Sequence, residues 1–159
     1  MRIPGAAKAK PSAKGLKVGI VASRFNEKIV NGLLTGALSA AAKAGADEKD
    51  LVIVRVPGAW EIPFAVRTIL RNPKKPALDC VIALGAVIRG ETAHFEYVSR
   101  GAIDGCAAAQ RDFGVPVALG ILTTENEAQA VARSSGAGNT GIEAALAAFE
   151  MATLARSHR

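Results

Sequence analysis

Apolar runs alternate with amphipathic segments along the chain, and this alternation predicts a repeated strand–helix order. Four short runs rich in β-branched and aliphatic residues predict buried strands, at residues 16–23, 51–56, 80–88 and 117–122. Between and after them, apolar residues recur at helical spacing. They predict helices that run to about residue 44, over about 61–71, 95–113 and 126–134, and, after a loop at 134–141, to about 156.

Glycine, proline and threonine residues mark the predicted element boundaries. Gly45 fits the position just after the first helix, and Pro63 fits the first turn of the second. The Asn72-Pro73 pair ends that second helix. Thr123 and Thr124 follow the fourth strand, and their side chains are predicted to cap the short helix after them.

The near-continuous apolar strands, each followed by a helix, predict an α/β fold with a parallel sheet covered by helices on both faces. Such sheets bind ligands beyond the carboxyl ends of their strands. In this chain each strand end is followed by an unusual segment. These segments are Arg24-Phe25-Asn26, Pro57-Gly58-Ala59-Trp60-Glu61, residues 85–95 and Thr123-Thr124-Glu125-Asn126. The sequence therefore predicts one ligand site at this edge of the sheet.

Composition predicts a single folded domain over residues 16–159, preceded by a flexible basic extension over residues 1–15. The net charge is +6, but residues 1–15 supply four of these charges, and Arg156 and Arg159 supply the other two. The net charge of residues 16–155 is zero. A nucleic-acid-binding protein, by contrast, normally has a basic face on its folded body. No nucleic-acid partner is therefore expected.

No apolar run approaches the length of a membrane span, and no signal-peptide core is recognisable at the N-terminus. Cys80 and Cys106 have neither metal-ligand nor disulfide-framework spacing and are expected to be small buried residues. These features favour a cytoplasmic protein with no metal site and no membrane partner.

His94 is the first candidate for chemistry, since the only other histidine, His158, lies one residue from the C-terminus. Two interpretations stay open. His94 is either a solvated or capping residue at a helix start, or a general acid or base, a role that imidazole suits because it titrates near neutrality.

The other candidates also have two interpretations each. Gly90-Glu91-Thr92 is a turn with a helix cap or an anion site at a helix N-terminus. Phe25 is a hydrophobic staple or a stacking surface for a flat ring. Glu61 complements a helix dipole or accepts ligand hydroxyls, and Trp60 belongs to the core, a subunit interface or a pocket wall. Arg133 is a solvated helix residue or a phosphate partner.

Taken together, these segments resemble the 6,7-dimethyl-8-ribityllumazine synthase family of riboflavin biosynthesis. The resemblance covers about residues 16–156. It is carried by Arg24-Phe25-Asn26, Pro57 to Pro63, Gly85 to His94, Gly120 to Asn126 and Gly138-Asn139-Thr140-Gly141. It implies a flavodoxin-like three-layer sandwich with a four-stranded parallel sheet. It also implies a homopentamer, or a multiple of one, with sites between subunits.

The implied reaction condenses 5-amino-6-(D-ribitylamino)uracil with 3,4-dihydroxy-2-butanone 4-phosphate and releases phosphate and water, without a cofactor. By resemblance, His94 is the general acid/base and Phe25 stacks on the pyrimidinedione. Ribityl binding is assigned to Ala59, Trp60 and Glu61, the ring edge to the backbone of Ala86, Val87 and Ile88, and phosphate binding to Glu91, Thr92 and Arg133 of a neighbour.

Two positions depart from the family pattern. Leu119 stands where many members have an aromatic residue from the adjacent subunit, and Thr140 stands where many have a lysine. These departures leave open a weakly catalytic, riboflavin- or lumazine-binding or shell-forming homologue. A flavodoxin-like signalling or nucleotide-binding domain is a third alternative, but Arg24-Phe25-Asn26 occupies the place of the acidic cluster expected there.

Overall fold

A computed structural model describes residues 10–72 and 77–158 of the chain. Strands and helices alternate as the sequence predicts. The strands are β1 (Val18–Ser23), β2 (Leu51–Val56), β3 (Cys80–Ile88) and β4 (Val117–Thr124). The helices are α1 (Glu27–Lys43), α2 (Ile62–Leu70), α3 (His94–Phe113), α4 (Glu127–Arg133) and α5 (Thr140–Ser157), with 3₁₀ turns at Glu48–Asp50, Ala59–Glu61 and Gly136–Gly138.

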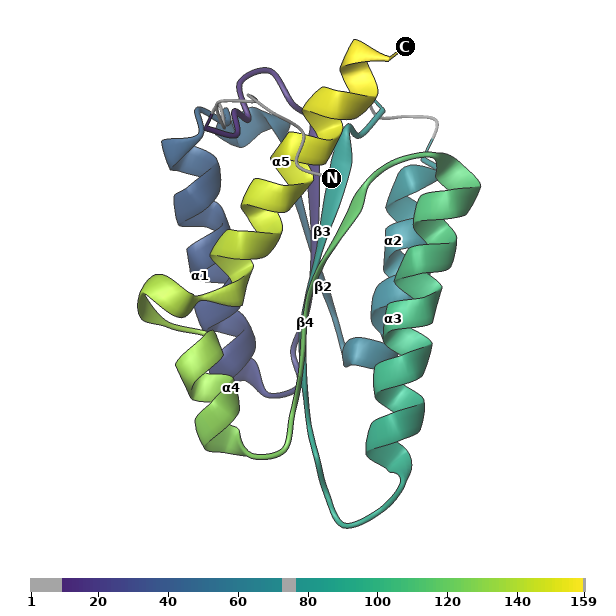
Figure 1. The fold of residues 1–159 in the computed structure, drawn as a ribbon. Coiled ribbons are helices and arrows are strands. Elements are labelled where there is room, and N and C mark those ends of the chain that lie inside the picture. The colour runs from purple at the N-terminus through teal and green to yellow at the C-terminus, as the bar shows by residue number, and fades with distance from the viewer. Residues whose placement is uncertain (1–9, 73–76, 159) are drawn as a thin grey trace, which may run out of the picture.

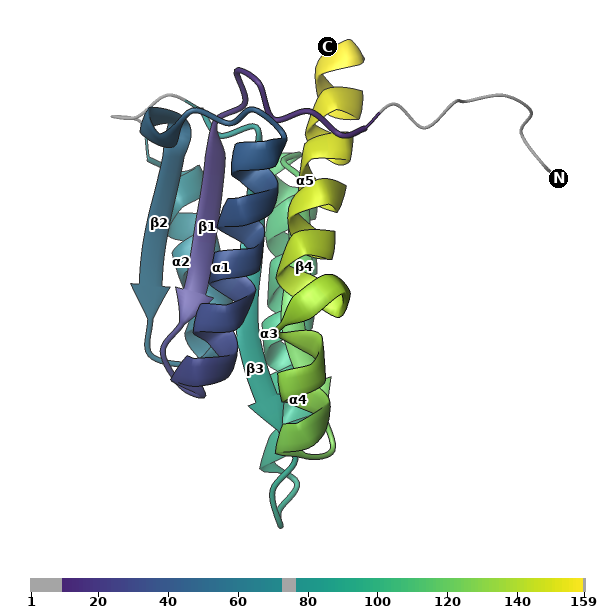
Figure 2. The same ribbon diagram turned by 90° about the vertical axis from the view of Figure 1, so that its left-hand side faces the viewer.

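The four strands form one parallel sheet in the order β2-β1-β3-β4. Helices α1, α4 and α5 cover one face of this sheet, and α2 and α3 cover the other (Figure 1). Strands β1, β2 and β3 point toward the same end of the molecule (Figure 2), and β4 runs parallel to β3. The structure confirms the predicted α/β fold with its four-stranded parallel sheet.

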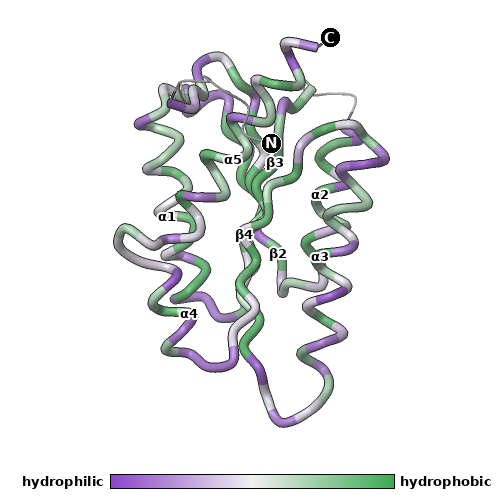
Figure 3. Tube along the Cα trace, viewed as in Figure 1, coloured by the Kyte–Doolittle hydropathy of each residue, from purple (hydrophilic) through white to green (hydrophobic). Residues whose placement is uncertain are grey.

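The sheet divides the apolar core into two halves, because alternate residues of each strand face opposite layers of helices. Ile82 and Leu84 of β3 pack toward α1 and α5, whereas Val81 and Ala83 pack toward α2 and α3. The hydrophobic residues accordingly concentrate along the strands and the inner faces of the helices (Figure 3). Helices α1 and α5 also approach each other closely: a Cβ at Gly141 would lie 2.0 Å from the carbonyl oxygen of Leu33.

The strand β4 is longer than predicted, and the predicted threonine caps are wrong. Thr123 and Thr124 continue the ladder with Val87 and Ile88 of β3. β-Branched residues fit a pleated sheet well, so both threonines pair with the long strand β3 and extend β4. The side chain of Asn126 caps α4 instead, accepting a hydrogen bond from the N–H of Gln129 at 2.9 Å.

Other boundaries differ from the prediction by one or two residues. The helix α5 begins at Thr140 rather than after residue 141, because the side chain of Asn139 accepts the N–H of Gly141 and caps it. A 3₁₀ turn at Ala59–Glu61 delays α2 to Ile62. Residues 16 and 17 precede β1, where the N–H of Lys17 bonds the Asp79 carboxylate.

The predicted N-terminal extension lies partly outside the described residues, which begin at Lys10. Pro73, proposed to end the second helix, also lies outside them. Within the described part, Ala13 is fully buried in the core, and its N–H donates to the carbonyl oxygen of Ala44 at 2.9 Å. The packed body therefore includes residues before position 16.

Candidate active site

A pocket of about 730 Å³ lies at the carboxyl end of the sheet, where the sequence predicts a ligand site. Three strand-end segments and the start of α3 line it. They contribute Phe25 and Asn26, Pro57 to Glu61, Ala86 to Ile88, and Gly90, Thr92, His94, Phe95, Tyr97 and Val98. The structure thus brings together side chains that are far apart in the sequence.

The turn between β1 and α1 presents Phe25 to this pocket. Its backbone is held in place, since the N–H groups of Arg24 and Phe25 donate to the carbonyl oxygens of Val56 and Pro57 at 2.8 and 2.9 Å. Asn26 adopts a left-handed backbone conformation, which asparagine tolerates better than most residues, and its side-chain amide donates to the carbonyl oxygen of Ala86 at 2.9 Å. The Phe25 ring itself is 72% exposed, so it is free to stack on a ligand.

The turn between β2 and α2 holds Trp60 and Glu61. The Glu61 carboxylate accepts the N–H of Gly58 at 2.9 Å, which orients it within the turn. The indole of Trp60 packs on α3 where only glycine leaves room, since a Cβ at Gly101 would lie 2.2 Å from the ring. Trp60 nevertheless remains 60% exposed and forms a wall of the pocket.

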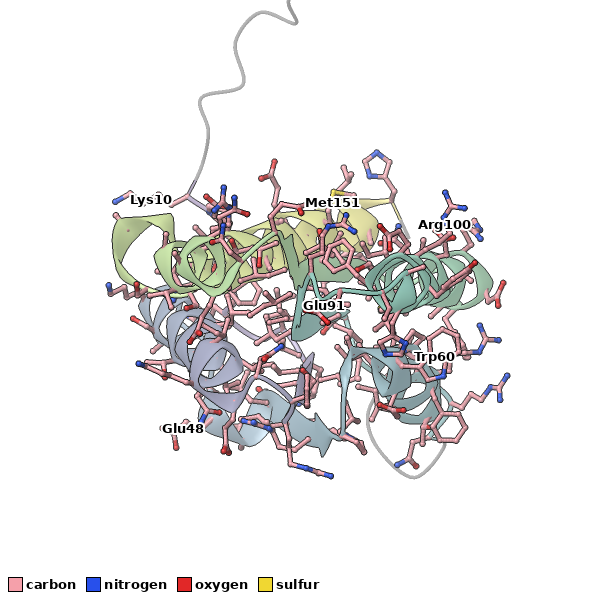
Figure 4. The ribbon with its side chains drawn as sticks, turned by 90° about the horizontal axis from the view of Figure 1, so that it is seen from below. Lys10, Glu48, Trp60, Glu91, Arg100 and Met151 are labelled. Carbon is pink, nitrogen blue, oxygen red and sulfur yellow. The ribbon has the colours of Figure 1, made fainter. Side chains whose placement is uncertain are left out.

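The loop from β3 to α3 hangs beyond the sheet and leads to His94, the first residue of α3 (Figure 1). His94 is exposed and lines the pocket, and its N–H lies 3.4 Å from the hydroxyl oxygen of Thr92. The first N–H groups of a long helix lack partners within the helix and favour an anion. Seen from the carboxyl end, Glu91 lies at the end of the sheet and Trp60 on the side of α2 and α3 (Figure 4).

A charged cluster that the sequence did not reveal joins this loop to neighbouring elements. The Nε of Arg89 donates to the Glu125 carboxylate at 2.6 Å, its Nη1 donates to Glu96, and its guanidinium lies 4.2 Å from the centre of the Phe95 ring. Hydrogen bonds from Glu96 and Glu125 raise the pKa of Arg89, and Arg89 lowers the pKa of Glu96. A separation of 36 residues hid the Glu125 contact from the sequence.

Three predicted site residues do not line this pocket in the single chain. Arg133 ends α4, on the opposite face of the sheet from α3, and its Nη1 donates to the carbonyl oxygen of Gln129 at 3.0 Å. Leu119 lies within the edge strand β4 and is 48% exposed. Glu91 is exposed on the loop but is also not among the lining residues.

Neither a metal centre nor a membrane span is found in the part of the chain that the structure describes. Among residues 10–72 and 77–158, no three His, Cys, Asp or Glu side chains gather to hold a metal ion. Over the same residues, no helix is both long and apolar enough to cross a membrane.

The fold and the site define a flavodoxin-like α/β protein with a ligand pocket at the carboxyl end of its sheet, lined by aromatic rings, one carboxylate and one imidazole. Residues 15–156 match the family model of 6,7-dimethyl-8-ribityllumazine synthase. The chain is 46% identical over 155 residues to a protein of Syntrophus aciditrophicus (strain SB) named 6,7-dimethyl-8-ribityllumazine synthase, and the match covers 97% of this chain and 99% of that protein. The chain belongs to the 6,7-dimethyl-8-ribityllumazine synthase family, and it is an enzyme of riboflavin biosynthesis.

Proposed function

We propose that the pocket at the carboxyl end of the sheet is where this chain condenses 5-amino-6-(D-ribitylamino)uracil with 3,4-dihydroxy-2-butanone 4-phosphate. The observation that carries the proposal is that Phe25, Trp60, Glu61, the end of β3 and His94 line one pocket. This set combines a stacking ring, a hydroxyl acceptor and a proton carrier, the three properties that the two substrates require.

The pyrimidinedione substrate occupies the part of the pocket between Phe25 and the end of β3. Phe25 stacks on the flat ring, for which its exposed face is suited. The backbone groups of Ala86, Val87 and Ile88 bond the polar edge of the ring. The turn formed by Ala59, Trp60 and Glu61 holds the ribityl chain, with the Glu61 carboxylate accepting hydrogen bonds from its hydroxyls.

The phosphate substrate binds at the start of α3. Backbone N–H groups of Glu91 and Thr92 and the Thr92 hydroxyl donate to the phosphate oxygens, and the helix dipole favours their negative charge. Arg133 of a neighbouring subunit supplies the cation. This division puts the phosphate beside His94 and the ring beside Phe25.

His94 moves protons during imine formation and phosphate elimination. The pyrimidine amine adds to the substrate carbonyl, and water leaves as the imine forms. Removal of a carbon-bound proton then accompanies the loss of phosphate, and ring closure releases a second water. Both substrates are intrinsically reactive, so holding them in place and transferring protons supply the catalysis.

We further propose that the active enzyme is a homopentamer, or a multiple of one, with each site shared between two subunits. Support comes from the positions of Arg133 and Leu119, which do not line the pocket of their own chain. The large exposed rings of Phe25, Trp60 and Tyr97 around the pocket also favour a covering neighbour. A cytoplasmic location suits the two buried free cysteines, Cys80 and Cys106.

Turnover is the direct test of the proposed reaction. Purified protein mixed with both substrates should form the fluorescent lumazine faster than the uncatalysed reaction, with heat-denatured protein as the control. A rate equal to that control would contradict the proposal.

Shared sites are tested by mixing two inactive variants. After joint unfolding and refolding, His94→Ala and Arg133→Ala subunits should regain activity, because some sites then combine an intact His94 with an intact Arg133. Each variant refolded alone supplies the baseline. Mixtures no more active than that baseline would argue for sites built within single chains.

A further inference from the structure

We propose that Arg89 is a positioning residue whose guanidinium braces the β3–α3 loop, defined here as residues 89–93, against both α3 and the end of β4. The brace fixes the position of the backbone at Glu91 and Thr92 and of His94. The inference builds on the proposed function, because it assigns a role to this loop in that reaction.

Arg89 contacts the elements at both ends of the loop. Its side chain bonds Glu96 in the first turn of α3, and through Nε it bonds Glu125 just after β4, at 2.6 Å. Its own N–H donates to the carbonyl oxygen of Thr124 at 2.8 Å. The guanidinium therefore ties residues on both sides of His94 to the neighbouring strand end.

The loop has little else to hold it. Residues 89–94 are all exposed, and a Cβ built at Gly90 would meet no atom within 4 Å. The hydrogen bond from the N–H of His94 to the Thr92 hydroxyl oxygen is long, at 3.4 Å. A segment with few buried contacts opens easily, so a planar fork that bonds two carboxylates has a large effect on its geometry.

Arg89 is not itself free to act as a phosphate ligand. Its guanidinium is already bonded to two carboxylates and lies 4.2 Å from the centre of the Phe95 ring. The cluster of Arg89, Glu96 and Glu125 has two negative charges and one positive charge, so it does not attract an anion. Recruiting Arg89 to a phosphate would leave both carboxylates without their partner.

The first experiment measures hydrogen exchange and kinetics of Arg89→Met. We expect amide exchange in residues 90–95 to rise about tenfold or more. We also expect kcat to fall about tenfold, because a small displacement of a catalytic group is costly. The KM for the pyrimidine should be unchanged, since its proposed ligands lie on other segments.

Arg67→Met is the matched control. Arg67 also bonds a carboxylate of α3, Asp112 at 2.6 Å, and lies 5.4 Å from the centre of the Phe113 ring, but at the far end of the helix. Arg67→Met should leave loop exchange and kcat at the wild-type values. Unchanged loop exchange in Arg89→Met would overturn the brace whether or not the protein turns over, so this result is independent of the proposed reaction.

A double variant, Glu96→Gln with Glu125→Gln, separates the brace from a direct phosphate contact. If Arg89 braces the loop, losing both carboxylates should reproduce the faster exchange and lower kcat of Arg89→Met. A lower KM for the phosphate substrate with unchanged loop exchange would instead identify Arg89 as a ligand and overturn the proposal. Arg89→Lys should not restore wild-type exchange, because an ammonium lacks the planar fork; full restoration would also overturn it.

Discussion

The two ends of the sheet both have clusters of charged side chains, but they differ in burial. At the amino end, Asp79 is only 7% exposed, and its carboxylate accepts hydrogen bonds from Arg156 at 2.8 and 2.7 Å and from the N–H of Lys17 at 2.8 Å. Arg156 also donates to the carbonyl oxygen of Gly15 at 2.9 Å. This cluster joins the last helix to the first and third strands.

At the carboxyl end, by contrast, the charged and aromatic side chains are exposed around the pocket. Glu91 and Thr92 lie on the exposed β3–α3 loop, and His94 is the exposed first residue of α3. Phe25 and Trp60 present most of their surface to solvent. At the amino end, the buried Asp79 carboxylate has hydrogen-bond partners, so this cluster stabilises the fold. At the carboxyl end, the side chains are exposed and therefore available to ligands. Substitutions at the two ends should therefore affect different properties.

The largest effect should follow from His94→Ala at the carboxyl end. Loss of the proton carrier should lower kcat about 100-fold, with the melting temperature and pyrimidine affinity nearly unchanged. Lumazine fluorescence at saturating substrate measures this, and His158→Ala, the other histidine, is the control. If pyrimidine binding were lost as well, His94 would be a binding residue instead.

Asp79→Ala should give the corresponding effect on stability at the amino end. It leaves Arg156 and the Lys17 N–H without their shared acceptor, so the free energy of unfolding should fall by about 2–3 kcal/mol. Urea unfolding measures this, while kcat of the folded enzyme should stay unchanged. Asp112→Ala, which breaks an exposed ion pair with Arg67, should cost far less. Equal losses from the two variants would contradict the difference in burial.

Alkaline pH should also weaken the amino end through Cys80. Burial, reinforced by the Asp79 charge, raises the pKa of the Cys80 thiol to about 12. Because the folded state holds this proton more tightly, the thiol's contribution to stability is complete below about pH 8.5 and is lost as the pH rises toward the raised value. Cys80→Ala should flatten the decline in unfolding free energy between pH 9 and 11 by at most about 1.4 kcal/mol per pH unit. If the unfolding free energies of Cys80→Ala and wild type fell with pH at the same rate, the Cys80 thiol would not contribute to the decline.

The smallest effect should follow from Phe25→Leu. Leucine keeps an apolar contact but loses ring stacking, so the KM for the pyrimidine should rise about fivefold, with little change in kcat. Phe64→Leu is the matched control, since Phe64 is 78% exposed on α2 and does not line the pocket. A similar KM for both variants would exclude a stacking role for Phe25.

Much of the fold could be predicted because its determinants are local. The bounds of β2 and β3 follow directly from their apolar runs, and a glycine just past the end of α1, Gly45, has the positive φ that its place in the sequence predicted. The end of β4 could not be predicted in this way. Whether Thr123 and Thr124 extend a strand or cap a helix depends on pairing with β3, some 36 residues earlier.

The pocket was predictable in outline for a different reason. Parallel strands end at a common edge, so the segments at Phe25, Trp60 and His94 were expected to meet wherever each strand stopped. No comparable rule predicts the contacts of Arg89 from the sequence. Arg89 bonds Glu125 only because β3 and β4 lie side by side and end at the same level.

The sequence by itself determined the order of strands and helices, the parallel sheet and the edge at which the site lies, because periodicity and chain direction are properties of short segments. Only the tertiary structure decided which charged residues are buried in ion pairs at the amino end of the sheet and which are exposed near the pocket. Asp79 and Glu96 are both carboxylates paired with an arginine, and composition cannot separate them. The difference arises because neighbouring elements exclude water from one and not from the other, and burial depends on the packing of distant segments.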